Sequence, residues 1–369
     1  MHRLITLFTP VLCAMATWPF SPPGDQAGPA HRTPSVQAAH PPDLRGYSLI
    51  FNDDFNGRQL NTALWDYRQE NSVRQGSLFL RSNVSVGDGH LLMAGNRLSG
   101  GYSCSMISTE KSFRFKYGYA ECRADLGNIS FGATFAFWLQ STTNGASQDP
   151  AMDGVEVDIF EYNLNSGGKD FIQHNLHWNG YGAGHRHLGA SEPIAGLSSG
   201  YHLFGLEWTP REYIVYVDGA ERTRTSTAIS HRDEFLLLSN LITDDGFGGD
   251  RKAGRYPEFF NIDYVKVYAP PPAVNLYGDC NYKGWIGMGL RPGKYNSADL
   301  RALAGATTGQ NGAASVEVPK GWKVTLYSGD NFSGASRVLV SDTPCLTNFG
   351  PDGRIASLII VKTHSHDQR

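Results

Sequence analysis

The segment Glu156-Val157-Asp158-Ile159-Phe160-Glu161 places three acidic residues within six positions and separates them by apolar residues. Side chains of a β-strand alternate between its two faces, so Glu156 and Asp158 share one face. The apolar spacers turn toward the opposite face, which indicates that this face is buried against a core. The segment therefore predicts a central β-strand with one acidic face.

Glu161 falls on the apolar face if this strand is regular. A one-residue β-bulge between Asp158 and Glu161 returns it to the acidic face, and bulges are common beside active sites. Three crowded carboxyl groups cannot all ionise easily, so at least one pKa rises. Retaining glycoside hydrolysis needs such a separation, with an ionised nucleophile and a protonated acid about 5 to 5.5 Å apart. An acidic strand edge or a calcium cluster is the alternative interpretation.

The chain around this segment is typical of an all-β protein. Residues 47–268 form a series of short alternating runs, such as Tyr213-Ile214-Val215-Tyr216-Val217, separated by turn signals such as Asp218-Gly219. Charged residues make up only 18% of the chain and there are 42 glycines, which suits a turn-rich extracellular protein. We expect a β-sandwich or jelly roll.

The two ends of the chain read differently. Residues 1–16 combine a basic start with a short apolar run and predict a secretory signal, and residues 17–46 read as a flexible leader. No later run is long enough to span a bilayer. The net charge of −3 offers no basic field for nucleic acid, so a neutral polysaccharide is the expected partner.

Four cysteines remain after removal of Cys13 with the signal, and export favours disulfides. A bridge between Cys104 and Cys122 is feasible if their strands pair, and Cys280 with Cys345 could close the C-terminal part. Four buried free thiols are the alternative.

Residues 269–273 form a Pro-rich linker that predicts a domain boundary. Beyond it, the pattern Tyr277-x4-Tyr282-x-Gly284 recurs as Tyr327-x4-Phe332-x-Gly334. Each copy is followed by a serine that opens an apolar strand, Ser315 in the first copy and Ser357 in the second. The sequence predicts two similar β units in residues 274–363, followed by a short tail, 364–369.

Several motifs in residues 47–268 resemble glycoside hydrolase family 16, and they occur in the order of that family. Besides the acidic segment they are residues 51–57 (FNDDFNG) with Trp65, 83–86 (NVSV), 116–124 (KYGYAECRA), 136–139 (AFWL), 202–208 (HLFGLEW) and 262–268 (IDYVKVY). The resemblance implies a concanavalin-like β-jelly-roll sandwich with a sugar-binding groove across its concave sheet. It further implies that Glu156 is the nucleophile, Asp158 its assistant, and Glu161 the acid and then the base.

The resemblance also implies sugar contacts along the groove. The residues concerned are Trp138, His177, Trp178, Trp208, Glu121, Arg123 and Asn83. Core packing is the alternative for each tryptophan, and a surface ion pair is the alternative for Glu121 and Arg123.

No cofactor is expected for catalysis. Asp263, with backbone near Gly89, resembles a structural calcium site of the family, although an ordinary strand-start aspartate explains it equally well. The cluster of His174, His177, His185 and His187 has the composition of a zinc site, but the first two histidines face opposite ways on a strand.

The C-terminal repeat resembles the βγ-crystallin fold, a double Greek key in which the glycine permits a folded hairpin that the later serine ties down. The positions that bind calcium in that family have lost side-chain ligands here, so tight calcium binding is not expected.

These features predict a secreted, monomeric endo-glycosidase that cleaves a β-linked polysaccharide, with β-1,3-glucan as the best candidate. The bulged E-x-D-x-x-E pattern resembles the branch of laminarinases, agarases and carrageenases, so an endo-galactanase is an alternative. Transglycosylation on the same site and a non-catalytic carbohydrate-binding protein are further alternatives.

Overall fold

A computed structural model of the chain describes residues 42–304, 313–346, 349 and 355–363. The predicted signal segment, the leader up to residue 41 and the tail from residue 364 lie outside the described residues. Among the helices that are described, none has both the length and the apolar character needed to cross a membrane.

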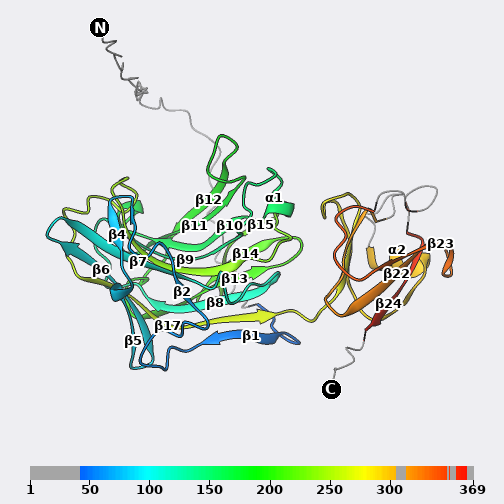
Figure 1. The fold of residues 1–369 in the computed structure, drawn as a ribbon, viewed down its shortest axis with the longest axis horizontal. Helices are drawn as coiled ribbons and strands as arrows, with labels where there is room; N and C mark the ends of the chain where they lie inside the picture. Colours follow the sequence, from blue (N-terminus) through cyan, green and yellow to red (C-terminus); the bar gives the residue numbers. More distant parts are fainter. Residues whose placement is uncertain (1–41, 305–312, 347–348, 350–354, 364–369) are drawn as a thin grey trace, which may run out of the picture. The chain divides into compact units, whose positions relative to one another are not determined.

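The N-terminal part is a β-jelly roll, as the sequence predicts. In the described chain, 17 strands form one hydrogen-bonded sheet that folds over itself into two facing layers (Figure 1). Every strand pair in it is antiparallel except that of β4 with β7. We call the two layers A and B.

Layer A contains β1 (Ser48–Asp53), β5 (Val84–Gly87), β6 (His90–Leu98), β8 (Gly118–Asp125), β13 (Tyr201–Trp208), β14 (Tyr213–Val217), β15 (Ala220–Thr225) and β17 (Glu258–Ala269). Layer B contains β2 (Asp66–Tyr67), β7 (Gly101–Ser108), β9 (Ala133–Gln140), β10 (Glu156–Tyr162), β11 (Phe171–Trp178), β12 (Arg186–Pro193) and β16 (Phe235–Ile242). The short strands β3 (Val73–Arg74) and β4 (Ser77–Phe79) adjoin β7.

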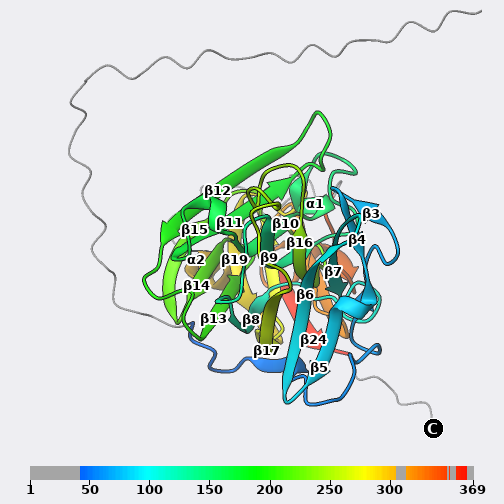
Figure 2. The ribbon, with the colours of Figure 1, turned by 90° about the vertical axis from the view of Figure 1, so that its left-hand side faces the viewer.

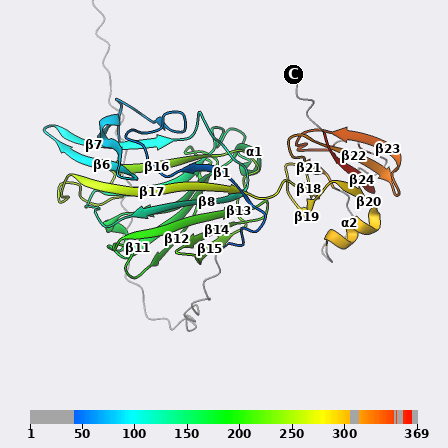
Figure 3. The same ribbon diagram turned by 90° about the horizontal axis from the view of Figure 1, so that it is seen from below.

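The pairing order places β10 inside layer B and not at its edge. It pairs with β9 on one side and β11 on the other, and β11 continues to β12 (Figure 2). Layer A runs from β1 through β17, β8, β13 and β14 to β15 (Figure 3). The predicted central position of the acidic strand is therefore confirmed.

Aromatic side chains join the two layers in the core. Phe135 of layer B stacks on Phe260 of layer A at 4.9 Å between ring centroids, and Phe160 packs on Phe204 at 4.2 Å. All four rings are fully buried, and each such burial contributes roughly 1.5 to 3 kcal/mol to folding. Phe160 lies in the acidic segment, so the core fixes which face of β10 its carboxylates occupy.

Short helical turns occur only at the ends of strands in the described jelly roll. They are η1 (Arg81–Asn83), α1 (Pro150–Asp153) and η2 (Leu164–Ser166). The turn α1 directly precedes β10, and Asp149 caps it by accepting a hydrogen bond from the backbone N–H of Ala151 at 3.2 Å.

The C-terminal part has its own hydrophobic core and two small sheets. One sheet contains β18 (Val274–Tyr277), β19 (Trp285–Leu290) and β21 (Ser315–Glu317). The other contains β20 (Gly293–Tyr295), β22 (Trp322–Gly329), β23 (Ser333–Leu339) and β24 (Ser357–Lys362). The helix α2 (Ser297–Ala304) was not expected from the sequence.

The predicted repeat of this C-terminal module is present as two equivalent arrangements. The Ser315 hydroxyl donates to the carbonyl of Asp279 and accepts from the N–H of Tyr282. The Ser357 hydroxyl makes the same two bonds with Gly329 and Phe332. The two copies of the repeat thus make equivalent serine contacts, while the two similar β units and the βγ-crystallin resemblance stay predictions.

The two predicted disulfides have different outcomes. Cys280 and Cys345 are bonded, as expected. Cys104 and Cys122 are free and buried, so the predicted bridge between them is wrong. Their strands do not form a pair, because β7 belongs to layer B and β8 to layer A. The segment between them crosses from one layer to the other.

Candidate active site

Strand β10 carries the bulge that the acidic spacing predicts. Asp158 lies opposite Trp138 of β9, but the next paired residue is Phe160, opposite Phe137. Against β11 the register also shifts between Asp158 and Glu161. The extra residue places Glu161 opposite Ala136, on the same face as Asp158. All three carboxylates therefore lie on the face of layer B that turns away from the core.

Each carboxylate of this acid cluster has different polar contacts. Glu156 accepts hydrogen bonds from Gln140 Nε2 at Oε2, 2.7 Å, and from the Tyr181 hydroxyl at Oε1. Glu161 accepts one from Asn175 Nδ2 at 2.6 Å. Asp158 Oδ2 lies 3.4 Å from His177 Nε2.

These contacts separate the acidities of the three groups. Burial raises the pKa of Glu156, but the hydrogen bonds from Tyr181 and Gln140 oppose that effect. Burial raises the pKa of Glu161 to about 7. The hydrogen bond from Asn175 lowers this pKa, and the charge of Glu156 raises it further. Burial, followed by the charges of Glu161 and Glu156, holds the pKa of Asp158 well above its usual range. The cluster favours charge on Glu156 and protons on the other two groups.

Two of the predicted sugar contacts lie beside the acid cluster. Trp138 stands opposite Asp158, and its Nε1 donates to Ser239 Oγ at 3.2 Å. His177 stands opposite Glu156. Burial, with the neighbouring His185 and His187, lowers the pKa of His177 to about 4, so its ring is neutral near pH 7. Their contact with sugar stays a prediction.

The predicted groove positions of two tryptophans are wrong. Trp178 follows His177 and so turns to the opposite face, where it packs against the main core. Trp208 lies in layer A and is only 1% exposed, with its Nε1 donating to the carbonyl of Ser230 at 3.2 Å. Core packing, the alternative for both, is what the structure has.

The predicted sugar contacts of Glu121 and Arg123 are also wrong. Both lie on β8 of layer A, whereas the acids lie on layer B. Arg123 forms an ion pair with Asp263, and hydrogen bonds from Tyr119, Tyr264 and Tyr268 act on Glu121. The alternation of side chains on β8 correctly predicts that Glu121 and Arg123 share one face. That face, however, is the outer face of layer A.

Asn83 is buried at the end of η1. Its amide donates to Ser103 Oγ at 3.0 Å and its Oδ1 accepts from Asn96 at 3.3 Å. These bonds give it a structural role, and its contact with sugar stays a prediction.

The calcium site predicted from Asp263 and Gly89 does not fit the side-chain arrangement. Ile262 of β17 pairs with Leu91 of β6, which brings Asp263 close to the turn at Gly89. However, the Asp263 carboxylate is paired with the guanidinium of Arg123, which already neutralises its charge. A calcium ion would have to displace that cation.

The four clustered histidines, His174, His177, His185 and His187, are divided between two faces, as their spacing predicts. His174 is buried, and its Nδ1 lies 2.6 Å from the carbonyl oxygen of Ile159. His177, His185 and His187 gather on the other face, with ring centroids 5.2 to 6.1 Å apart. Potential ligand atoms of His177, Glu156 and Asp158 lie within 4.8 Å of one another, but two of these groups belong to the acid cluster.

Three residues that contact the acids were missed at the sequence level. Gln140 and Asn175 lie two positions from Trp138 and His177, so alternation alone would have placed both beside the acids. Tyr181 lies in the segment between β11 and β12, where no periodic pattern indicates direction.

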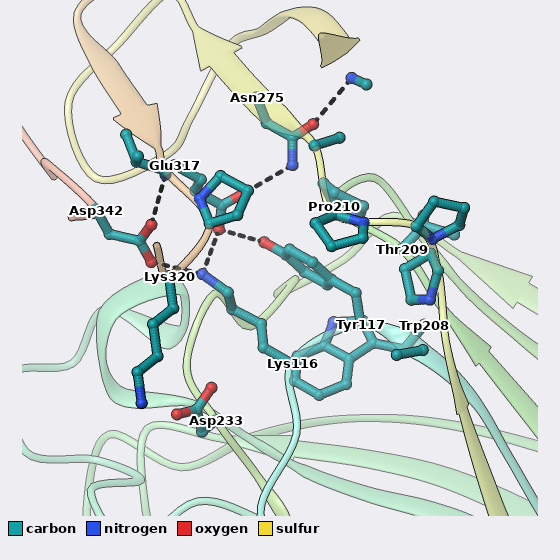
Figure 4. Close-up of a pocket in the computed structure, with 18 of the residues that line it drawn as sticks. Lys116, Tyr117, Trp208, Thr209, Pro210, Asp233, Asn275, Glu317, Lys320 and Asp342 are labelled. Atoms are coloured by element: carbon teal, nitrogen blue, oxygen red, sulfur yellow. Dashed lines mark hydrogen bonds and ion pairs between the residues drawn. The ribbon is translucent and has the colours of Figure 1, made fainter. Parts of the chain in front are cut away.

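The described part of the chain also has a cavity of about 870 Å3 (Figure 4). The linker, Trp208 and the C-terminal module line it, and Lys116 bonds there to Glu317 and Asp342. None of the three acids contributes to its lining.

By its fold and its acid cluster, the chain is a β-jelly-roll protein that carries the E-x-D-x-x-E pattern on a bulged strand. Residues 66–235 match the family described as Glycosyl hydrolases family 16. This part of the chain is thus similar to the domains of glycoside hydrolase family 16.

The chain is also similar to two known endo-glycanases. The chain is 30% identical over 168 residues to the endo-1,3-1,4-beta-glycanase ExsH of Rhizobium meliloti, covering 46% of this chain and 34% of the relative. It is 26% identical to the endo-1,3-1,4-beta-glycanase EglC of the same organism, covering 59% of this chain and 51% of the relative. The chain thus spans between a third and about half of these two relatives.

Solved structures share the fold. The laminarinase from Flavobacterium sp. UMI-01 superimposes with a TM-score of 0.51 at 24% identity, covering 60% of this chain and 100% of that one.

Proposed function

We propose that this chain is a retaining endo-β-glycosidase that cleaves a β-linked polysaccharide by double displacement. The observation that carries the proposal is the unequal bonding of two glutamates on one face of β10. Glu156 accepts two hydrogen bonds that favour its charge, whereas burial raises the pKa of Glu161 to about 7. A nucleophile and an acid are the two carboxyl states that this reaction needs.

In the first step, Glu156 attacks the anomeric carbon while Glu161 gives its proton to the glycosidic oxygen. The C–O bond breaks, the leaving sugar departs as an alcohol, and the glycosyl group stays attached to Glu156 as an ester. Glu161 is now ionised and takes a proton from water, whose oxygen attacks the same carbon and releases Glu156. Each step inverts the anomeric centre, so the product retains its configuration.

Asp158 lies between the two glutamates in sequence and is 5% exposed. Its raised pKa supports a protonated form, which can share its proton with Glu156 while that group is charged. Its contact with His177, at 3.4 Å, supports a fixed orientation of the carboxyl. We assign Asp158 the assisting role.

A β-1,3-glucan is the proposed substrate. Support comes from similarity to proteins named endo-1,3-1,4-beta-glycanase and, in fold, to a laminarinase. Export of the protein and a monomeric state are further proposals, which rest on the sequence.

A reducing-sugar assay over laminarin, mixed-linkage glucan, agarose and carrageenan tests the proposal. We expect release of oligosaccharides from laminarin, and a loss on the order of 10³-fold or more in Glu156→Gln. The control is Asp299→Asn, a change in α2 of the C-terminal module, which should keep wild-type activity. Wild-type activity of Glu156→Gln on every substrate that the native protein cleaves would disprove the proposal.

A further inference from the structure

Tyr181 reaches the acid cluster from outside the sheet. It lies between β11 and β12, and its side chain is 64% exposed. Its hydroxyl nevertheless donates a hydrogen bond to Oε1 of Glu156. An exposed ring gains little from burial, so the contact depends on how the surrounding segment holds the ring.

The segment that carries Tyr181, residues 179–185, is tied to the loop that precedes α1. The N–H of Gly180 donates to Asn144 Oδ1 at 3.0 Å. Gln148 Nε2 bridges the two segments, donating to the carbonyls of Gly145 at 3.0 Å and Asn179 at 3.3 Å. These bonds hold the backbone directly before Tyr181.

The ring of Tyr181 has a second support on the histidine side. It stacks on His185 with centroids 5.0 Å apart and planes at 26°. His185 Nε2 in turn lies 3.0 Å from His177 Nδ1, and the two imidazole planes differ by only 5°. The hydroxyl is thus held toward Glu156 by stacking as well as by the backbone.

Glu156 therefore accepts one bond at each oxygen, from Tyr181 at Oε1 and from Gln140 at Oε2. A carboxylate has about four acceptor positions, so each oxygen keeps a free lone pair. Both donors favour the ionised form, and neither prevents Oε1 from approaching an anomeric carbon.

We propose that Tyr181 is a positioning residue that keeps Glu156 ionised and oriented for attack. The inference rests on the proposed function, since it concerns the nucleophile of the same site. Tyr181 acts through Glu156 and takes no part in proton transfer to the sugar.

The test is the pH dependence of kcat/KM for Tyr181→Phe, which keeps the ring and removes the hydroxyl. Loss of a bond to the charged form raises the pKa of Glu156, so the acid limb of the profile moves to higher pH. We expect kcat/KM to fall about 10- to 100-fold on that limb, the usual effect of losing a bond to a charged group. A merely structural role would not move the limb.

Tyr256→Phe is the matched control, because its hydroxyl donates to the carbonyl of Phe131 and not to an acid. Its profile should match the wild type. The inference would be overturned if the acid limb of Tyr181→Phe did not shift, or if this variant were faster than the wild type at every pH. The proposed function would still stand in that case, provided that the wild-type protein is active. A wild-type protein inactive on every polysaccharide would instead refute the proposed function.

Discussion

Different hydrogen-bond donors distinguish the three chemically similar carboxyl groups of the acid cluster. Glu161 receives one such bond, from Asn175, whose Nδ2 lies 2.6 Å from Oε2. A hydrogen bond to a carboxylate stabilises its charged form and so lowers its pKa. Asn175 therefore limits how far burial raises the pKa of Glu161, which is about 7.

Asn175→Ala should move the alkaline limb of the pH profile to higher pH. Without the donor the pKa of Glu161 rises, so the proposed acid stays protonated over a wider range. We also expect kcat/KM to fall roughly tenfold, because the carboxyl loses an orienting bond worth about 1.4 kcal/mol. A pH series of initial rates measures both effects.

Asn52→Ala is the control, since Asn52 lies on β1 of layer A and its Nδ2 donates to Asp54 Oδ2 at 2.7 Å. Its limb should stay in place. An alkaline limb that Asn175→Ala leaves unmoved would show that Glu161 is not the group that titrates there.

At the scale of the strand, the spacing of polar and apolar residues was sufficient to predict β10. One apolar residue separates Glu156 from Asp158, and two separate Asp158 from Glu161. Three acids at this spacing share one face only if the strand contains a bulge. The shift between Asp158 and Glu161 has that form. The same alternation could have found Gln140 and Asn175.

Alternation does not tell which layer a strand joins. Glu121 and Arg123 were expected beside the acids, yet β8 pairs with β13 and β17 in layer A. Cys104 and Cys122 were expected to bond, yet they belong to different layers. Strand order depends on contacts between residues far apart in sequence, which local patterns do not contain.

Tyr181 illustrates a second limit of sequence reasoning. Loops have no periodic constraint on side-chain direction, so their contacts follow from tertiary bonds such as that of Gly180 with Asn144. Functional residues on loops therefore cannot be predicted from the periodicity of the sequence.

At the scale of the whole molecule, Glu317 of the C-terminal module links to the jelly roll through buried polar contacts. It is nearly fully buried and accepts bonds from Tyr117 at 2.6 Å and Lys116 at 3.0 Å. Tyr277 and Asn275 of its own module donate to its other oxygen. The carboxylate therefore has partners on both sides of the linker (Figure 4).

Burial alone would raise the pKa of Glu317. The hydrogen bond from His231 and the charge of Lys116 outweigh burial and hold that pKa well below its usual range. Because the folded pKa lies below the unfolded value, the stabilisation is present above the unfolded pKa of about 4.3 and is lost as the pH falls below it.

Glu317→Ala should lower the free energy of unfolding by about 3 to 5 kcal/mol at pH 7, because Lys116 loses its buried partner and keeps only the more exposed Asp342. Urea unfolding at pH 7 and at pH 3.5 measures the effect, and the difference from wild type should shrink at the lower pH. Glu317→Gln keeps the shape of the side chain and should lose less. Equal stability of Glu317→Ala and wild type at pH 7 would contradict this account of the link.

The central claim is that Glu156 and Glu161 cleave a β-glycosidic bond with retention. Proton NMR of laminarin in the first minutes of hydrolysis, before mutarotation, follows the anomeric signals of the new reducing ends. The β-anomer should appear first, with the α-anomer growing only as mutarotation proceeds. An α-anomer that appears first would mean inversion in a single displacement and would contradict the roles assigned to both glutamates.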